Sequence, residues 1–198
     1  MPARLAVIML HVEQPNATPI LSDDDIRDYL RIDGTDDAAV ITAINAAATE
    51  RVQEEIGRCL STTTLIGTAD AWPCNERYIS LPYPPIQAVV AVTYIDAEGN
   101  LQTMSDDLYE LYRDRMYILP GVSWPTIQSN RAGAIQVTYI AGYPDDSNGS
   151  LCPQPIRQAI KWVAGTMYEH RESVVVGGAA VELPQNVEWA LSPYKVRF

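Results

Sequence analysis

Three pairs of adjacent carboxylates are the residues of this sequence best suited by type to acid–base or metal chemistry. They are Asp36 and Asp37, Asp106 and Asp107, and Asp145 and Asp146. Each pair falls where the local sequence predicts a helix start or a turn, positions at which carboxylates cap backbone amides and face solvent. We therefore interpret all three pairs as capping or solvated groups and expect no catalytic residue among them.

Segment 145–150 places several oxygen donors on one turn, as a calcium-binding loop does. Its Gly149 comes one place too early for such a loop, and the twelfth position is Ile156, where the loop needs an acid. His11 and His170 are the only histidines, which excludes a site built from three histidine ligands and argues against one built from two. The sequence predicts no metal site and no cofactor.

Nucleophilic and nucleotide chemistry also lack their usual patterns. Segment 121–125 has the serine of a nucleophile elbow but not its second glycine, and no glycine-rich phosphate loop occurs. We interpret His170 as a cap at a helix end. The three cysteines, Cys59, Cys74 and Cys152, are odd in number and lack Cys-x-x-Cys spacing, which favours a reducing interior over a disulfide framework.

The charge balance excludes partners that are held by positive charge. The chain has 14 basic and 25 acidic residues, a formal net charge of −11 and only two lysines. A strongly acidic protein repels phosphate groups, so neither non-specific nucleic-acid binding nor a stable contact with an anionic membrane is expected. The apolar run 5–10 is too short to span a bilayer, and we expect no signal peptide or membrane anchor.

Helical patterns lie at the two ends of the sequence. Ser22 and the acids behind it predict the start of a short helix reaching about residue 32, and Thr35 is expected to cap a longer helix that ends near Gly57. Apolar residues at spacings of three and four predict further helices over 153–171 and, more briefly, 184–191. Residues 174–178 are expected to form a movable or edge segment, with Gly177 and Gly178 as its hinge.

Between the helical patterns the sequence favours strands. Runs of β-branched residues bounded by Pro and Gly predict strands over 62–68, 78–81, 86–95, 108–112, 116–119 and 134–140. Turns at 96–100 and 113–115 indicate antiparallel pairing of consecutive strands. The predicted fold class is therefore α+β, with a helical bundle of N- and C-terminal helices and an inserted antiparallel β unit. We predict an N-terminal extension over 1–21, a helical part from 22–60 with 151–198, and a β domain over 61–150.

The order of several segments resembles one known family, the head-tail connector or head-completion adaptor proteins of tailed bacteriophages and phage-like gene transfer particles. The resemblance covers roughly residues 20–198. The segments that carry it are 25–32 followed by Asp36 and Asp37, 81–86, 92–96 with Gly99, 135–144, 155–159 and 167–172. Residues 1–20 are longer than the family pattern.

The resemblance implies a structural virion protein of the neck, made in the host cytoplasm, and no enzyme. About twelve copies would form a ring under the portal protein, extend the channel through which double-stranded DNA passes without specific binding, and offer a platform to the next neck or tail component. The near-neutral, aromatic C-terminal segment suits docking on a protein. We predict that it is the portal-binding arm, carried by Pro184, Trp189, Tyr194, Lys195, Arg197 and Phe198.

The acidic balance fits a channel that must not hold DNA, because carboxylates repel the duplex. We predict that Glu50, Glu54 and Glu55, which cluster late in the long helix, line that channel. The alternatives are a neck stopper or tail-tube component, an acidic module that mimics DNA, and, from another class, a small acidic hydrolase using Asp106 or Asp145 as its base. The hydrolase lacks a second partner group.

Overall fold

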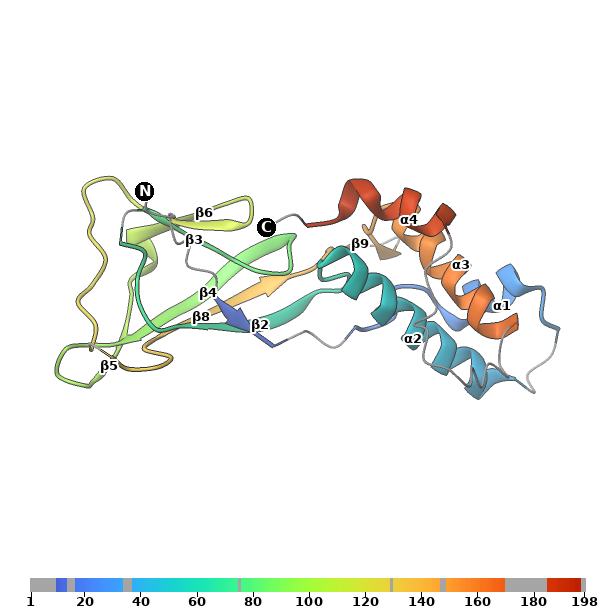
Figure 1. Cartoon of the computed structure of the whole chain (residues 1–198), viewed down its shortest axis with the longest axis horizontal. Coiled ribbons are helices and arrows are strands. Elements are labelled where there is room, and N and C mark those ends of the chain that lie inside the picture. The colour runs from blue at the N-terminus through green and yellow to red at the C-terminus, as the bar shows by residue number, and fades with distance from the viewer. Residues whose placement is uncertain are drawn as a thin grey trace, which may run out of the picture. The chain divides into compact units, whose positions relative to one another are not determined.

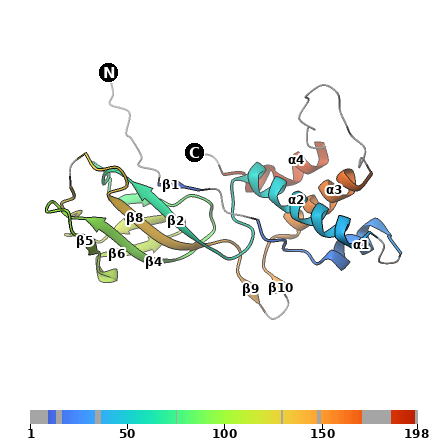
Figure 2. The ribbon, with the colours of Figure 1, turned by 90° about the horizontal axis from the view of Figure 1, so that it is seen from below.

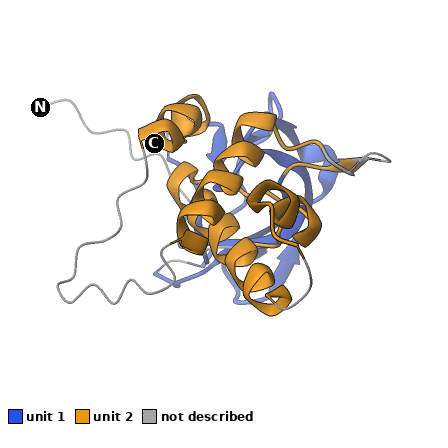
Figure 3. Ribbon diagram, turned by 90° about the vertical axis from the view of Figure 1, so that its right-hand side faces the viewer, with its two compact units in different colours: residues 1–15, 62–142 blue, residues 16–61, 143–198 orange. Residues whose placement is uncertain are grey.

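The computed structural model of the chain describes residues 10–13, 17–33, 37–74, 76–128, 130–146, 149–169 and 185–196. The chain divides into two compact units, which Figure 3 colours separately. The sheet unit comprises residues 1–15 and 62–142, and the helical unit comprises residues 16–61 and 143–198. The larger part of the sheet unit is therefore inserted between two halves of the helical unit.

The helical unit contains four α-helices, a 3-10 turn and a small hairpin within its described residues (Figure 1). The elements are α1 (Asp23–Leu30), α2 (Ala38–Ile56), β9 (Asp145–Asp146), β10 (Gly149–Ser150), α3 (Gln154–Glu169), α4 (Gln185–Leu191) and η2 (Ser192–Tyr194). β9 and β10 pair antiparallel where the sequence favoured only a turn. A two-residue ladder has no alternating pattern long enough to be read from sequence.

The ends of the helices follow from their sequences. Ser22 forms a reciprocal capping box with Asp25 at the start of α1, as its hydroxyl predicts. Gly57 ends α2 in the left-handed conformation at φ 65°, which a residue without a Cβ adopts readily. At the start of α2 the N-cap is Asp37, which makes no side-chain capping bond to the helix amides, and the predicted cap Thr35 lies outside the described residues.

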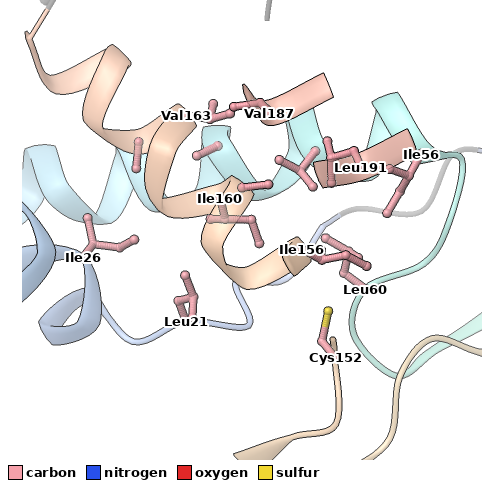
Figure 4. Packing of buried hydrophobic residues seen from close by; sticks show 14 of the residues in the cluster. Leu21, Ile26, Ile56, Leu60, Cys152, Ile156, Ile160, Val163, Val187 and Leu191 are labelled. Atoms are coloured by element: carbon pink, nitrogen blue, oxygen red, sulfur yellow. The ribbon is translucent and has the colours of Figure 1, made fainter. Parts of the chain in front are cut away.

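Apolar side chains from all four helices meet in one core (Figure 4). α2 and α3 form its largest contact, through residues such as Val52 and Ile160 that are fully buried. α4 contributes Val187 and Leu191, which Figure 4 shows beside α3. Burying such side chains contributes roughly 1.5–3 kcal/mol each before entropic costs, so α4 is an integral part of this unit.

The sheet unit contains a five-stranded and a three-stranded antiparallel sheet (Figure 2). The larger sheet has the order β1-β2-β8-β4-β5, and the smaller has the order β3-β7-β6. The strands are β1 (His11–Val12), β2 (Thr63–Ala69), β3 (Tyr78–Ser80), β4 (Ile86–Ile95), β5 (Leu101–Thr103), β6 (Tyr109–Tyr112), β7 (Arg115–Ile118) and β8 (Ile135–Ala141), with the 3-10 turn η1 (Asp106–Leu108) before β6.

Each sheet buries one face and exposes the other. Val137 and Tyr139 of β8 are fully buried, as are Ile79 of β3 and Met116 of β7, so the inner faces of both sheets form the core of the sheet unit. The Tyr139 hydroxyl donates to the Pro82 carbonyl at 2.9 Å, which satisfies the one polar group of that side chain. This strict alternation along β8 is the pattern of a sheet with one side toward solvent.

The predicted α+β class is confirmed: helices and antiparallel sheets segregate into separate units. The turn at 96–100 joins β4 to β5, with Asp96 accepting from the amides of Glu98 and Asn100 and Gly99 at φ 89°. Segment 174–178 lies outside the described residues. In the part of the chain described here, no helix has both the length and the apolar character that crossing a membrane requires.

Candidate functional site

The carboxylates of these pairs that the structure describes fall on different elements. Asp106 and Asp107 occupy the exposed first turn of η1, and Asp145 lies in β9. Asp37 accepts a hydrogen bond from the hydroxyl of Tyr168 at 2.9 Å, which ties the end of α3 to the start of α2. Among the described residues, no three His, Cys, Asp or Glu side chains are grouped as a metal would require.

Two of the predicted arm residues, Trp189 and Tyr194, line an apolar groove of the helical unit. Trp189 of α4 is 80% exposed, the most exposed large apolar side chain of the described chain. The groove has a volume of about 420 Å³, and Pro155 and Trp162 of α3 form one wall while Trp189, Pro193 and Tyr194 form the other. All of its lining residues are uncharged.

α4 presents Trp189 because the two sides of this helix have different surroundings. Val187 and Leu191, four residues apart, are fully buried in the helical core, and Trp189 lies between them in sequence on the outer side. The buried pair fixes the helix, so the exposed indole is held on a rigid support. Apolar lining, aromatic side chains and a rigid base are the features of a protein-docking site.

The residues after the groove are anchored to the end of α2. The amide of Val196 donates to the carbonyl of Ile56 at 2.9 Å, and Nε of Arg58 donates to the carbonyl of Tyr194 at 2.5 Å. The ammonium of Lys195 pairs with the carboxylate of Glu55. Residues 194–196 are therefore part of the folded helical unit. Pro184, Arg197, Phe198 and the predicted hinge Gly177 and Gly178 lie outside the described residues.

The three glutamates predicted to line a channel have different surroundings. Glu50 is exposed on α2. Glu54 and Glu55 lie 3.7 and 3.5 Å from the guanidinium of Arg51, and Glu55 is also the partner of Lys195. Most of the charge of Glu55 is thus balanced locally, and Glu50 and Glu54 are the more exposed members of the group. Their place in a channel stays a prediction.

A cluster of polar side chains holds α1 against α2 in the helical unit. The buried amide of Asn45 donates to the carbonyl of Leu21 and to the carboxylate of Asp23, both at 2.9 Å. The hydroxyl of Thr42 and the amide of Asn45 hold the pKa of Asp23 below its usual value. Ser22 lowers the pKa of Asp25 in the same way, by its hydroxyl and its amide. Both carboxylates are therefore charged when the helices are docked.

Sequence reasoning did not find the groove, because its two walls come from segments some thirty residues apart. The sequence predicted the helix that is α4 over 184–191, and the spacing of Val187 and Leu191 places both on one face of it. Trp162 is partly buried against the helical core and also lines the groove.

The comparisons with known proteins point to one class of particle. The profile of a family described as HCP, head completion protein, matches residues 19–197. A chain from the virion of a native gene transfer agent (GTA) particle is similar in fold, with a TM-score of 0.71 and 24% identity over 96% of this chain and 97% of that chain. Curated proteins gave no match.

Two chains from necks of such particles are similar to the same extent. One comes from the neck of an empty GTA particle computed with C6 symmetry, with a TM-score of 0.70 and 22% identity. The other comes from the neck of a native GTA particle computed with C12 symmetry, with a TM-score of 0.69 and 22% identity. Each covers 96% of this chain and 97% of its own. At these identities the likeness establishes the shared fold.

Proposed function

The chain belongs to the head completion protein family, and from this premise we propose that it is a structural component of the neck between head and tail, where about twelve copies form a ring that docks on the portal protein. The family profile covers residues 19–197, which include most of both units. The 6-fold and 12-fold symmetries of the similar necks support a multi-subunit ring within the virion. In this proposal the protein carries out no catalysis.

The groove beside Trp189 is the surface proposed to contact the portal. It combines an 80% exposed indole with an uncharged lining and a rigid support. Residues 151–198 have a formal net charge of +1, whereas the whole chain has a net charge of −11. An aromatic anchor in a desolvated pocket dominates many protein interfaces. The described part of the predicted arm therefore acts as a fixed face of the helical unit, with Trp189 as its anchor.

α2 is proposed to face the DNA channel with Glu50 and Glu54. Carboxylates on a channel wall repel phosphates and leave DNA free to move, whereas basic residues would retain it. Glu55 has a smaller part in this proposal, because Lys195 and Arg51 balance its charge.

The portal of the same particle provides the test. Trp189→Ala is expected to weaken portal binding at least tenfold, because truncating an interface anchor costs about 2 kcal/mol or more. Val40→Ala on α2, another exposed apolar residue of the same unit, is the matched control and should bind as the unchanged protein does. Electron microscopy of the complex should show a ring of about twelve copies.

Unchanged portal affinity of the Trp189→Ala protein would overturn the groove as the docking face. Failure of the unchanged protein to bind the portal, with binding to a tail-side component instead, would favour the neck stopper or tail-tube alternative. Deleting residues 184–198 is a poor test, because it removes Val187 and Leu191 from the core.

A further inference from the structure

The outer face of the five-stranded sheet carries no Asp, Glu, Lys or Arg side chain on its paired strands. Strand registers place thirteen residues on this face, here called the neutral face. They are His11, Thr64, Ile66, Thr68, Ala88, Ala91, Thr93, Ile95, Leu101, Thr103, Gln136, Thr138 and Ile140. In a chain of which 20% of residues are charged, a solvent-facing surface of this size would ordinarily include Asp, Glu or Arg.

The neutral face is open in the described structure. Ile66 is 51% exposed in its centre, and Leu101 is 67% exposed at the β5 edge. Thr138 lies between Ile66 on β2 and Ala91 on β4, so the centre is a flat row of small and β-branched side chains. Figure 2 shows β2, β8 and β4 side by side in this sheet. Interface cores are poor in charged residues, and this face has that composition.

The three-stranded sheet exposes a different surface on the other side of the same core. Its outer residues form the tyrosine-arginine face, defined as Tyr78, Ser80, Glu110, Tyr112, Arg115 and Tyr117. The Arg115 guanidinium lies over the ring of Tyr78, 4.5 Å from its centroid. The ring of Tyr117 lies 5.3 Å from Tyr78 and 6.4 Å from Tyr112. Tyr and Arg are the residues enriched at the centres of protein interfaces.

We propose that, in the ring of the proposed function, the neutral face of one copy packs against the tyrosine-arginine face of the next copy. A closed ring needs two different surfaces on each subunit, so that every contact is head to tail. The two outer faces of the sheet unit meet this need, because they lie on opposite sides of one core. Tyr hydroxyls and the Arg115 guanidinium can donate to the Thr hydroxyls opposite them.

The charge of the protein favours a second copy of this chain as the partner that covers the neutral face. Two chains of net charge −11 repel each other over most of their surfaces, and a face without charges is where they approach at least cost. A strongly basic partner would instead be drawn to the acidic surfaces. Each pairwise contact can be weak, since ring closure gives every copy two contacts and adds their effect.

Two lysine substitutions test the two faces separately. Ile66→Lys places a charge in the neutral face, and Tyr112→Lys places one on the tyrosine-arginine face, where Tyr112 is 60% exposed. Both positions point to solvent, so each variant should keep its fold by circular dichroism. Ile66→Thr and Tyr112→Phe are conservative controls, and Val40→Lys repeats the charge change on the helical unit.

Analytical ultracentrifugation up to about 1 mM, the range in which weak contacts are measurable, gives the readout. The unchanged protein and the three controls should self-associate into oligomers. Ile66→Lys alone and Tyr112→Lys alone should stay monomeric. Their equimolar mixture should form dimers and stop there, because each variant retains the one face that the other needs. Portal binding by the monomeric variants should be unchanged at the Trp189 groove.

Three results would overturn the pairing of faces: a monomeric unchanged protein over this range, dimers of either variant alone, or a monomeric mixture of two folded variants. Dimers of one variant alone would mean that a face pairs with itself. Portal binding is measured separately, so loss of that binding with normal self-association would reject the proposed function and leave this pairing in place.

Discussion

Lys195 and Glu55 form an ion pair that joins the last described residues of the chain to the end of α2. The sequence had suggested two unrelated roles for them, one in a docking arm and one in a channel wall. Their contact makes both residues part of the support of the groove. It also leaves Glu50 and Glu54 as the exposed acids of α2.

The Lys195 pair should contribute little to stability. Both side chains are partly exposed, and such pairs stabilise by about 0.5 kcal/mol, less at high salt. Glu55→Gln is expected to lower the free energy of unfolding in urea by under about 1 kcal/mol, and Glu50→Gln by nothing measurable. A loss above about 2 kcal/mol in Glu55→Gln would show that the pair is a main anchor of residues 194–196.

Truncating a side chain on the buried side of α4 should cost far more stability than truncating one on its exposed side. Leu191→Ala empties a fully buried site and is expected to cost about 2–5 kcal/mol of unfolding free energy. Trp189→Ala, on the exposed side, should cost under about 0.5 kcal/mol. Urea denaturation followed by circular dichroism measures both. Equal losses in the two variants would contradict the two-sided role of this helix.

Acid should loosen the contact between α1 and α2. The pKa of Asp23 is lowered in the folded protein, so its charged form stabilises the fold above the ordinary pKa of 3.8, and that stability disappears as pH falls through the folded value. Thr42→Val removes the largest cause of the lowered pKa. When the pH is lowered from 5 to below about 4, the urea midpoint of this variant should therefore fall by less than that of the unchanged protein. Thr126→Val, in the sheet unit, is the control, and an identical pH profile in Thr42→Val would refute the assignment.

Gly67 is expected to be essential for the pairing of β1. A Cβ built at this residue would lie 2.8 Å from Cβ and Cδ1 of Leu10, so that Leu10 would have to move, and it would lie at a tight 3.1 Å from Cγ2 of Val12. Gly67→Ala should release β1 while β2 stays paired with β8. Hydrogen exchange would show faster exchange at residues 11–12, with Gly99→Ala as a comparison at a turn. Unchanged protection there would mean that β1 moves without unpairing.

The cysteines should differ in reactivity by position. Burial raises the pKa of Cys152 to about 12, so almost none of it is thiolate at neutral pH. Cys74 is exposed, and Cys59 is buried. A thiol reagent at pH 8 should modify one cysteine per folded chain and three after denaturation. Rapid loss of the Cys152 thiol in the folded protein would indicate that the helical core opens readily.

Local signals in the sequence predicted the parts of the fold that depend on local contacts. The Ser22 cap, the Gly57 helix end and the 96–100 turn are all set by residues within four positions of each other. The β-branched run over 134–140 likewise predicted the strand that is β8. These features need no knowledge of distant segments.

The parts that were missed depend on residues far apart in sequence. β1 is only two residues long, and it pairs with β2 at Gly67, which lies more than fifty residues later in the sequence and leaves room for β1 because it has no side chain. Hydrophobic periodicity could therefore not reveal this strand. The groove needs Trp162 and Trp189 from different helices. The neutral face depends on the register of five strands, and only the paired positions reveal that it lacks Asp, Glu, Lys and Arg.

Gln87 lies where the chain enters and leaves the inserted sheet unit. Its side-chain amide donates to the hydroxyl of Thr62 and to the carbonyl of Gly142, both at 2.9 Å. Residues 62–142 form a long loop from the viewpoint of the helical unit, and closing a flexible loop of that length costs about 4 kcal/mol of chain entropy. Once the sheet unit has folded, its ends are already adjacent. The two halves of the helical unit can then meet as if joined by a short linker, which lowers the effective contact order of the remaining folding step.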